Sequence, residues 1–228
     1  MASGGREGAV AQSRSLTQDE RDICGQIFRD SIPLDLVTIT VRQVVFGGYT
    51  PYGDINVGPE SYQGDFIAPV AASKGGADEI DDAHFFLHEM THVWQHHVGM
   101  PVALHWMQAR AAGRRVLRRS GKPRIAFYRD AATYAYDITP DQSDLLDYTM
   151  EQQCDIVADH FAKLYWNRPL DAGHHNVFGY ATPSGEQLRA VLARFLEDPG
   201  YPAREPGLWR ARARYRRRAA DEDDDGGG

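Results

Sequence analysis

The pattern of apolar and polar positions divides the chain into a strand-containing first part and a largely helical remainder. Residues 36–46 alternate, with Val37 and Ile39 pointing one way and polar side chains the other, as in a half-buried strand. Turn residues follow, and the segment 54–68 can supply one or two further short strands. We therefore predict a small, mostly antiparallel sheet within residues 36–70.

Helical periodicity dominates elsewhere. Thr17 followed by Glu20 has the spacing of a capping box and predicts a helix start. Residues 127–139 carry alternating aromatic side chains and are expected to be extended. A small sheet with several helices defines an α+β fold class. Further helices are predicted over residues 81–99, 102–119, 148–166 and 183–200.

The two ends of the chain differ from its centre in composition. Residues 1–15 are small and polar and are expected to be disordered. Residues 16–200 carry the periodic patterns and are predicted to form a single domain. Residues 201–228 are expected to form a tail that is first basic, at 209–218, and then acidic, at 221–225.

Charge and segment composition narrow the function classes. The formal net charge is −7, and the acidic run beside the basic tail would compete with phosphates, so nucleic acid is not an expected partner. No run approaches the roughly 18 apolar residues of a membrane span. The N-terminus lacks the apolar region of a Sec signal peptide, so we expect a protein that is cytoplasmic as synthesised. Delivery elsewhere would require a specialised secretion system.

The segment FFLHEMTHVWQHH carries the candidate chemistry. His88 and His92 are four residues apart, so on a helix both imidazoles project from one face and can reach one cation. With Glu89 they form an HExxH motif, the pattern of a zinc-binding helix whose glutamate acts as general base. Apolar residues surround the motif nearly all round, which predicts a buried helix. Buried histidines and a buried glutamate need compensating partners.

A catalytic zinc needs a third protein ligand and one open position. Gln95 and Val98 stand where the extended HExxHxxGxxH pattern has glycine and histidine, so that pattern is excluded. His96 is rotated too far around the helix. Glu151 is the better candidate, and Asp155, one helical turn later, can accept the free N–H of a liganding imidazole. The simpler alternatives are ordinary hydrogen-bonded histidines and a solvated acidic helix face.

These residues give the chain a resemblance to a known class. HExxH followed by a later ExxxD resembles the gluzincin class of zinc metallopeptidases. LHEMTHVWQ and YTMEQQCDIVADHF are similar to the zincin-type domains of bacterial vgr-related and Rhs-associated proteins, over about residues 15–165. The resemblance implies a zincin-like fold in which a small antiparallel sheet packs on the active-site helix. It implies zinc ligands His88, His92 and Glu151, the catalytic base Glu89 and the supporting carboxylate Asp155.

One residue departs from the pattern of these relatives. Cys154 stands where they usually have a small residue. It is either a thiol near the metal or, as we interpret it, a small buried apolar residue.

Two functions remain open. The first is a zinc-dependent endopeptidase acting on a peptide or protein substrate, in which Glu89 takes a proton from water, and which serves as an effector associated with type VI secretion. The second is a non-proteolytic, zinc-stabilised structural or carrier component of a bacterial injection system, with secretion-system proteins as partners. A protein ligand in the fourth coordination position, such as His84, His96 or Cys154, would favour the second. The enzyme also needs an oxyanion donor, for which the candidates are Tyr134, Tyr136, Tyr148 and His160.

Overall fold

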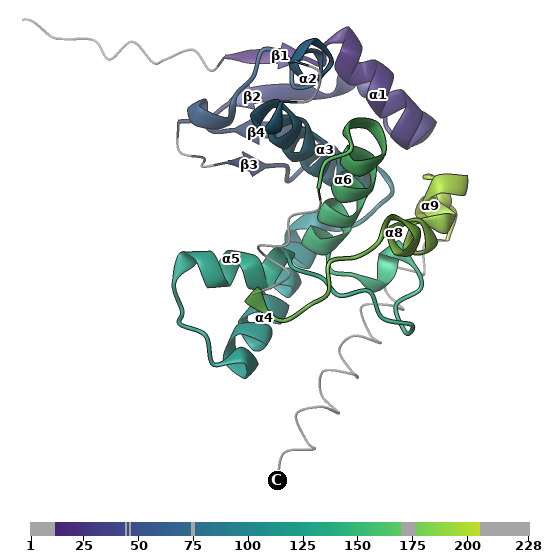
Figure 1. Ribbon diagram of the computed structural model, residues 1–228. Coiled ribbons are helices and arrows are strands. Elements are labelled where there is room, and N and C mark those ends of the chain that lie inside the picture. The colour runs from purple at the N-terminus through teal and green to yellow at the C-terminus, as the bar shows by residue number, and fades with distance from the viewer. Residues whose placement is uncertain (1–11, 44, 46, 74–75, 170–176, 206–228) are drawn as a thin grey trace, which may run out of the picture.

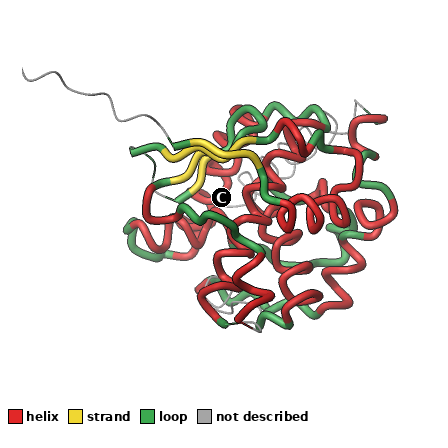
Figure 2. The backbone as a smooth tube through the Cα atoms, turned by 90° about the horizontal axis from the view of Figure 1, so that it is seen from above, coloured by secondary structure: helices red, strands yellow, loops and turns green. Residues whose placement is uncertain are grey.

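A four-stranded sheet lies at one side of the molecule, and helices make up the remainder (Figure 1, Figure 2). The structure is a computed structural model that describes residues 12–43, 45, 47–73, 76–169 and 177–205. The strands follow the order β1-β2-β4-β3 across the sheet. They are β1 (Ser13–Ser15), β2 (Thr38–Val41), β3 (Gly48–Tyr49) and β4 (Ile55–Val57).

The sheet is mixed, so the prediction of a mostly antiparallel sheet was wrong. β4 lies between β2 and β3 and runs parallel to β2, while the β1–β2 and β3–β4 pairs are antiparallel. A parallel pair needs a crossover and cannot be joined by a tight hairpin. The connection 42–54, which contains β3, supplies that crossover. The alternation of Val37 and Ile39 is confirmed, because both side chains are buried.

The first strand lies in a segment that was expected to be disordered. Residues 13–15 form β1 because their backbone pairs with the open edge of β2. Residues 1–11 and the charged tail beyond residue 205 lie outside the described residues, so the expectations for them are untested.

The helix predictions are largely confirmed. The capping box of α1 (Gln18–Phe28) is formed by Thr17 and Glu20, as predicted. α3 (Ala77–His97) begins four residues before its predicted start, and the predicted helix at 183–200 is divided into shorter helices. Among the described residues, no helix is both long and apolar enough to cross a membrane. Besides α1 and α3, the helices are α2 (Ala68–Ser73), α4 (Val102–Ser120), α5 (Ala126–Tyr134), α6 (Met150–Trp166), α8 (Gly185–Val191), α9 (Ala193–Glu197) and α10 (Tyr201–Arg204).

The prediction of an extended segment at 127–139 was wrong, because α5 occupies most of it. α5 packs closely on α4 (Figure 1). Gly113 of α4 permits the approach, since a Cβ there would lie 2.9 Å from Thr133 Oγ1 and 3.0 Å from the carbonyl oxygen of Ala132. This contact buries Ala131 and Ala132, and burial of that face stabilises a helix that the aromatic alternation did not indicate.

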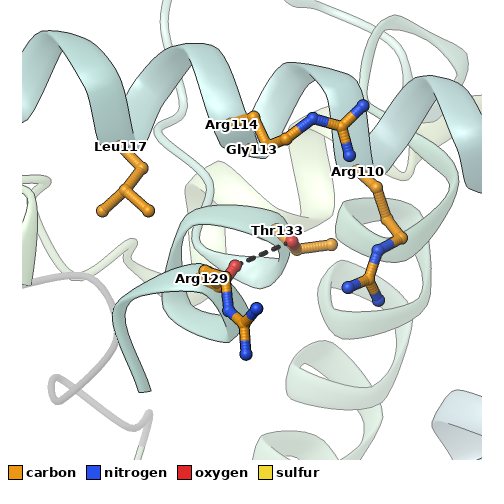
Figure 3. A pocket seen from close by; sticks show the side chains of 6 residues that line it. All are labelled: Arg110, Gly113, Arg114, Leu117, Arg129 and Thr133. Atoms are coloured by element: carbon orange, nitrogen blue, oxygen red, sulfur yellow. Dashed lines mark hydrogen bonds between the residues drawn. The ribbon is translucent and has the colours of Figure 1, made fainter. Parts of the chain in front are cut away.

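A pocket of about 120 Å³ opens between α4 and α5 (Figure 3). None of the side chains for which the sequence predicts chemistry lines it. Its lining residues are Arg110, Gly113, Arg114, Leu117, Arg129 and Thr133.

The centre of the core is α3, which is buried on nearly all sides, as predicted. It packs mainly on α6 and lies beneath the sheet (Figure 1). Trp94 is fully buried, packs edge-on against Phe195 and donates from Nε1 to the carbonyl oxygen of Pro199 at 2.8 Å. The HExxH helix is therefore fixed between the sheet, α6 and the C-terminal helices.

Candidate metal centre

The predicted ligand residues lie in one pocket of about 70 Å³. Its walls come from α3, α6, the edge strand β3 and the neighbouring helices α4 and α5. Residues that line it include His88, Glu89, His92 and Glu151, with Gly48, Thr50, Trp106 and Tyr134 around them.

α3 and α6 face each other through a row of histidines and a row of carboxylates. Each row has a spacing of four residues, which keeps its members on one helix face. The partners occur in reverse order on the two helices, so the helices run antiparallel. The contacts join His92 Nε2 to Glu151 Oε2 at 3.1 Å, His88 Nδ1 to Asp155 Oδ1 at 2.7 Å and His84 Nε2 to Asp159 Oδ1 at 2.9 Å.

Three of these side chains converge on one point. Oε2 of Glu151 lies 3.4 Å from Nε2 of His88 and 3.1 Å from Nε2 of His92. Zinc binds histidine nitrogen at about 2.0–2.1 Å in tetrahedral geometry, which spaces neighbouring ligand atoms about 3.3–3.4 Å apart. The observed separations and the donor atoms, two imidazole nitrogens and one carboxylate oxygen, therefore fit zinc.

The charges of the centre are set by burial and by the facing groups. Burial alone would lower the pKa of both imidazoles, but the hydrogen bonds that the His88 ring donates to Asp155 and Glu151 hold the pKa of His88 well above its ordinary value. Glu151 likewise raises the pKa of His92 against the effect of burial. Burial would raise the pKa of Glu151, but the two imidazoles hold it far below its usual range. The metal-free centre is thus an ion-paired cluster, and a cation that binds would displace its protons.

Glu89 lies beside the three converging side chains and is held by the edge strand. Its Oε2 accepts a hydrogen bond from Thr50 Oγ1 at 2.6 Å, and both side chains are buried. Gly48 of β3 leaves room for the carboxylate, because a Cβ at that position would lie 2.1 Å from Glu89 Oε1. The carboxylate therefore has a fixed position in the pocket wall.

Cys154 gives a second possible ligand set. Ligand-type atoms of His88, His92 and Cys154 all lie within 4.8 Å of one another, which makes these three residues a candidate metal site. The thiol lies 3.3 Å from Nδ1 of His92, whereas Nε2, on the opposite edge of the ring, faces Glu151. Burial raises the pKa of the metal-free thiol well above its ordinary value. The set containing Glu151 is the one that brings Nε2 of both imidazoles to one carboxylate oxygen.

The candidate oxyanion donors differ in whether they line the pocket. Tyr134 lines the pocket, and its ring lies edge-on to that of His88 with centroids 5.8 Å apart. Burial raises the pKa of Tyr134 far above its ordinary value, so its hydroxyl keeps the proton that a donor needs. Tyr136 donates to Asp159 at 2.6 Å. Tyr148 donates to a main-chain carbonyl at 3.3 Å, and neither Tyr136 nor Tyr148 lines the pocket.

The remaining histidine candidates lie outside the pocket lining. His84 is held by Asp159, and His96 and His160 do not line the pocket. Sequence reasoning missed two residues around Glu89, namely Gly48 and Thr50. They belong to a turn-like segment, GGYTPYGD, in which no pattern indicates contact with the motif helix.

Comparisons with known proteins show what this chain is similar to. No family model matches the chain. The chain is nevertheless homologous to an effector domain of a type VI secretion spike protein. The relative is the type VI secretion system spike protein VgrG2b of Pseudomonas aeruginosa, which is 32% identical over 188 residues. That match covers 80% of this chain but only 15% of the relative.

A solved structure gives the same relationship. The effector domain of Pseudomonas aeruginosa VgrG2b superimposes on this chain with a TM-score of 0.50 and 28% sequence identity. The match covers 79% of this chain and 82% of that domain. The α+β fold and the candidate metal site therefore belong to a chain that resembles this effector domain over most of its length.

Proposed function

We propose that this chain is a zinc-dependent endopeptidase domain that acts as an effector of a type VI secretion system. The observation that carries the proposal is the convergence of His88 Nε2, His92 Nε2 and Glu151 Oε2, with separations of 3.1–3.4 Å to the carboxylate oxygen. A zinc ion held by these atoms would supply Lewis acidity for a scissile carbonyl and for water. Each further role falls to the chain's own side chains.

Glu89 is the general base of this proposal. Its carboxylate is adjacent in sequence to a ligand but rotated away from it, so it faces the space where water and substrate meet. The hydrogen bond from Thr50 restricts the carboxylate to one orientation, which favours proton transfer along a defined direction. Glu89 accepts the proton of the attacking water and returns it to the leaving amine.

Two other residues support the reaction. Asp155 accepts from Nδ1–H of His88 at 2.7 Å, which leaves Nε2 of that ring free for the cation. Tyr134 lines the same pocket, keeps its hydroxyl proton and would donate to the oxyanion that develops on the substrate. The proposed substrate is a peptide or protein chain, because the HExxH arrangement of two histidines and a base is that of metalloproteases.

Delivery is proposed from homology. The chain resembles the effector domain of VgrG2b but spans 15% of that protein, so attachment to a spike and transport with it are part of the proposal. Secretion-system proteins would then be its partners before delivery.

The proposal is tested by zinc content and by hydrolysis of casein. Glu89→Gln is expected to keep bound zinc and to lose activity by roughly 10²- to 10⁴-fold, because a general base contributes about that much. Glu79→Gln is the matched control, since Glu79 is a partly exposed acid in the first turn of the same helix. Hydrolysis by Glu89→Gln at the wild-type rate would rule out the mechanism.

The candidate site that includes Cys154 supports a second function. If the thiol joined His88, His92 and Glu151, four protein ligands would fill the zinc coordination, and the metal would stabilise the domain without an open position for chemistry. Under this alternative, zinc removal lowers the unfolding temperature, and loss of the thiol abolishes zinc binding.

A further inference from the structure

The pocket between α4 and α5 is lined by three arginines and is called the arginine pocket below (Figure 3). Arg110 and Arg114 come from α4, and Arg129 comes from α5. Figure 3 shows the guanidinium groups of Arg110 and Arg129 pointing the same way, with Thr133 between them. Two helices therefore present cationic groups to one cavity.

The arginine pocket lies in a segment of one-sided charge. Residues 102–129, which span α4 and the start of α5, contain no aspartate or glutamate, although the formal net charge of the chain is −7. Every lysine and arginine in the segment is exposed. This region of an acidic protein therefore attracts anions. Its basic side chains are Arg110, Arg114, Arg115, Arg118, Arg119, Lys122, Arg124 and Arg129.

The pocket arginines are not neutralised from within the protein. In the part of the chain that the structure describes, no acid forms an ion pair with any of the three, whereas Arg14 pairs with Glu20 and Arg168 with Asp81. The guanidinium of Arg110 lies instead over the ring of Trp106, 4.9 Å from its centroid. A guanidinium binds a carboxylate or a phosphate through a fork of N–H donors. The donors of this pocket are therefore available to an external anion.

The arginine pocket adjoins the candidate metal pocket along both helices. On α4, Trp106 lines the metal pocket and Arg110 lines the arginine pocket one helical turn later. On α5, the adjacent residues Thr133 and Tyr134 line the arginine pocket and the metal pocket, respectively. One to two helical turns correspond to about 5–11 Å, which an extended peptide covers with roughly two or three residues. A polypeptide held beside Glu89 can therefore reach the arginines.

We propose that the arginine pocket binds acidic side chains of the polypeptide substrate that the candidate metal pocket holds. Its continuity with that pocket favours a polypeptide over a nucleic acid, because the same chain would occupy both. The role as a substrate subsite rests on the proposed function, whereas the affinity of the pocket for acidic peptides does not.

The affinity is measured with fluorescent hexaglutamate on the full chain carrying Glu89→Gln, which prevents cleavage. Each of Arg110→Gln, Arg114→Gln and Arg129→Gln should raise its Kd by roughly 3- to 10-fold, the effect of one charge-assisted contact at a partly exposed site. The Arg110→Gln/Arg129→Gln pair should raise it by roughly 10- to 100-fold. A glutamine peptide of the same length should bind much more weakly and should not respond. Arg129→Gln leaves the contact between Arg110 and Trp106 intact, so its effect reports charge and not stacking.

The matched control is the Arg115→Gln/Arg124→Gln pair, which removes the same charge from the same segment. Both residues are exposed, and neither lines the arginine pocket. At about 0.15 M salt the Debye length is about 8 Å, so charges remote from the pocket are largely screened. The control pair should change the Kd of hexaglutamate by less than about twofold.

Hydrolysis tests the connection to the metal pocket. With dephosphorylated casein, the Arg110→Gln/Arg129→Gln pair should raise KM by roughly 10-fold and leave kcat within about twofold, because the arginines bind the substrate away from the reacting atoms. With casein whose carboxyl groups have been converted to amides, the same pair should leave KM unchanged. A fall in kcat at constant KM, or an equal rise of KM for both forms of casein, would overturn the subsite.

Two binding results would overturn the affinity for acidic peptides. One is a loss of hexaglutamate binding in the control pair as large as that in the pocket pair. The other is an oligothymidylate of similar length that binds more tightly than hexaglutamate and depends on the same arginines, which would make the pocket a nucleic-acid site.

Failure of this proposal and failure of the proposed function give different results. If hexaglutamate binds through the arginines but wild type does not hydrolyse casein, the pocket is an acidic-peptide site and the peptidase is wrong. If wild type hydrolyses casein but hexaglutamate binds no better than the glutamine peptide, the arginine pocket is not a subsite and the peptidase stands.

Discussion

Replacing Gly48 by alanine tests whether the edge strand positions the catalytic base. The new Cβ would lie 2.1 Å from Oε1 and 2.3 Å from Cδ of Glu89. Ordinary Cβ contacts begin near 3.4 Å, so the carboxyl group must retreat by roughly 1 Å. Gly48 has no positive φ, so alanine itself causes no backbone strain there.

The expected loss follows from that displacement. A misplacement of about 1 Å can lower a rate by roughly 10²-fold, equivalent to about 2.7 kcal/mol of transition-state stabilisation. The clash is relieved by the far end of a side chain, so the free energy of unfolding should change little. Zinc content should stay at the wild-type level, because Glu89 is not a proposed ligand.

The assay is kcat/KM for hydrolysis of a protein substrate, measured beside zinc content and the unfolding temperature. Gly64→Ala is the matched control, since a Cβ at Gly64 meets nothing within 4 Å. A folded, zinc-loaded Gly48→Ala variant with wild-type kcat/KM would refute the role of Glu89 and of the strand that holds it.

Three further predictions concern the same centre. Tyr134→Phe should keep zinc and lose roughly 10²- to 10³-fold in kcat, as when one oxyanion donor is removed, and an unchanged kcat would exclude this tyrosine. Cys154→Ala should retain zinc in a metal titration, whereas loss of stoichiometric binding would favour the ligand set that contains the thiol. In the metal-free protein, the raised pKa values of His88 and His92 stabilise the fold below about pH 6.5, and this contribution is lost as the pH rises through their folded values. The lowered pKa of Glu151 stabilises the fold above about pH 4.5, so the unfolding temperature of wild type should exceed that of Glu151→Gln most between about pH 4.5 and 6.5, and a difference that grows at high pH would contradict this linkage.

Local sequence patterns were sufficient to predict the helices that carry the candidate chemistry. The capping box at Thr17 and the four-residue spacing of His88 and His92 depend on residues within one or two helical turns. The pairing of acids one turn apart on α6 likewise follows from its periodicity. These features are properties of a short segment, so the sequence predicts them without knowledge of the rest of the fold.

The sequence by itself determined the two helices and which of their faces bear histidines and carboxylates. Only the tertiary structure decided that α6 runs antiparallel to α3, so that Glu151 meets both imidazoles and Cys154 lies at the opposite edge of His92. It also decided that β4 runs parallel to β2 and that the β3 edge reaches Glu89. The physical reason is that these contacts join residues far apart in the chain, and their geometry is set by how the buried faces pack together, which no local periodicity encodes.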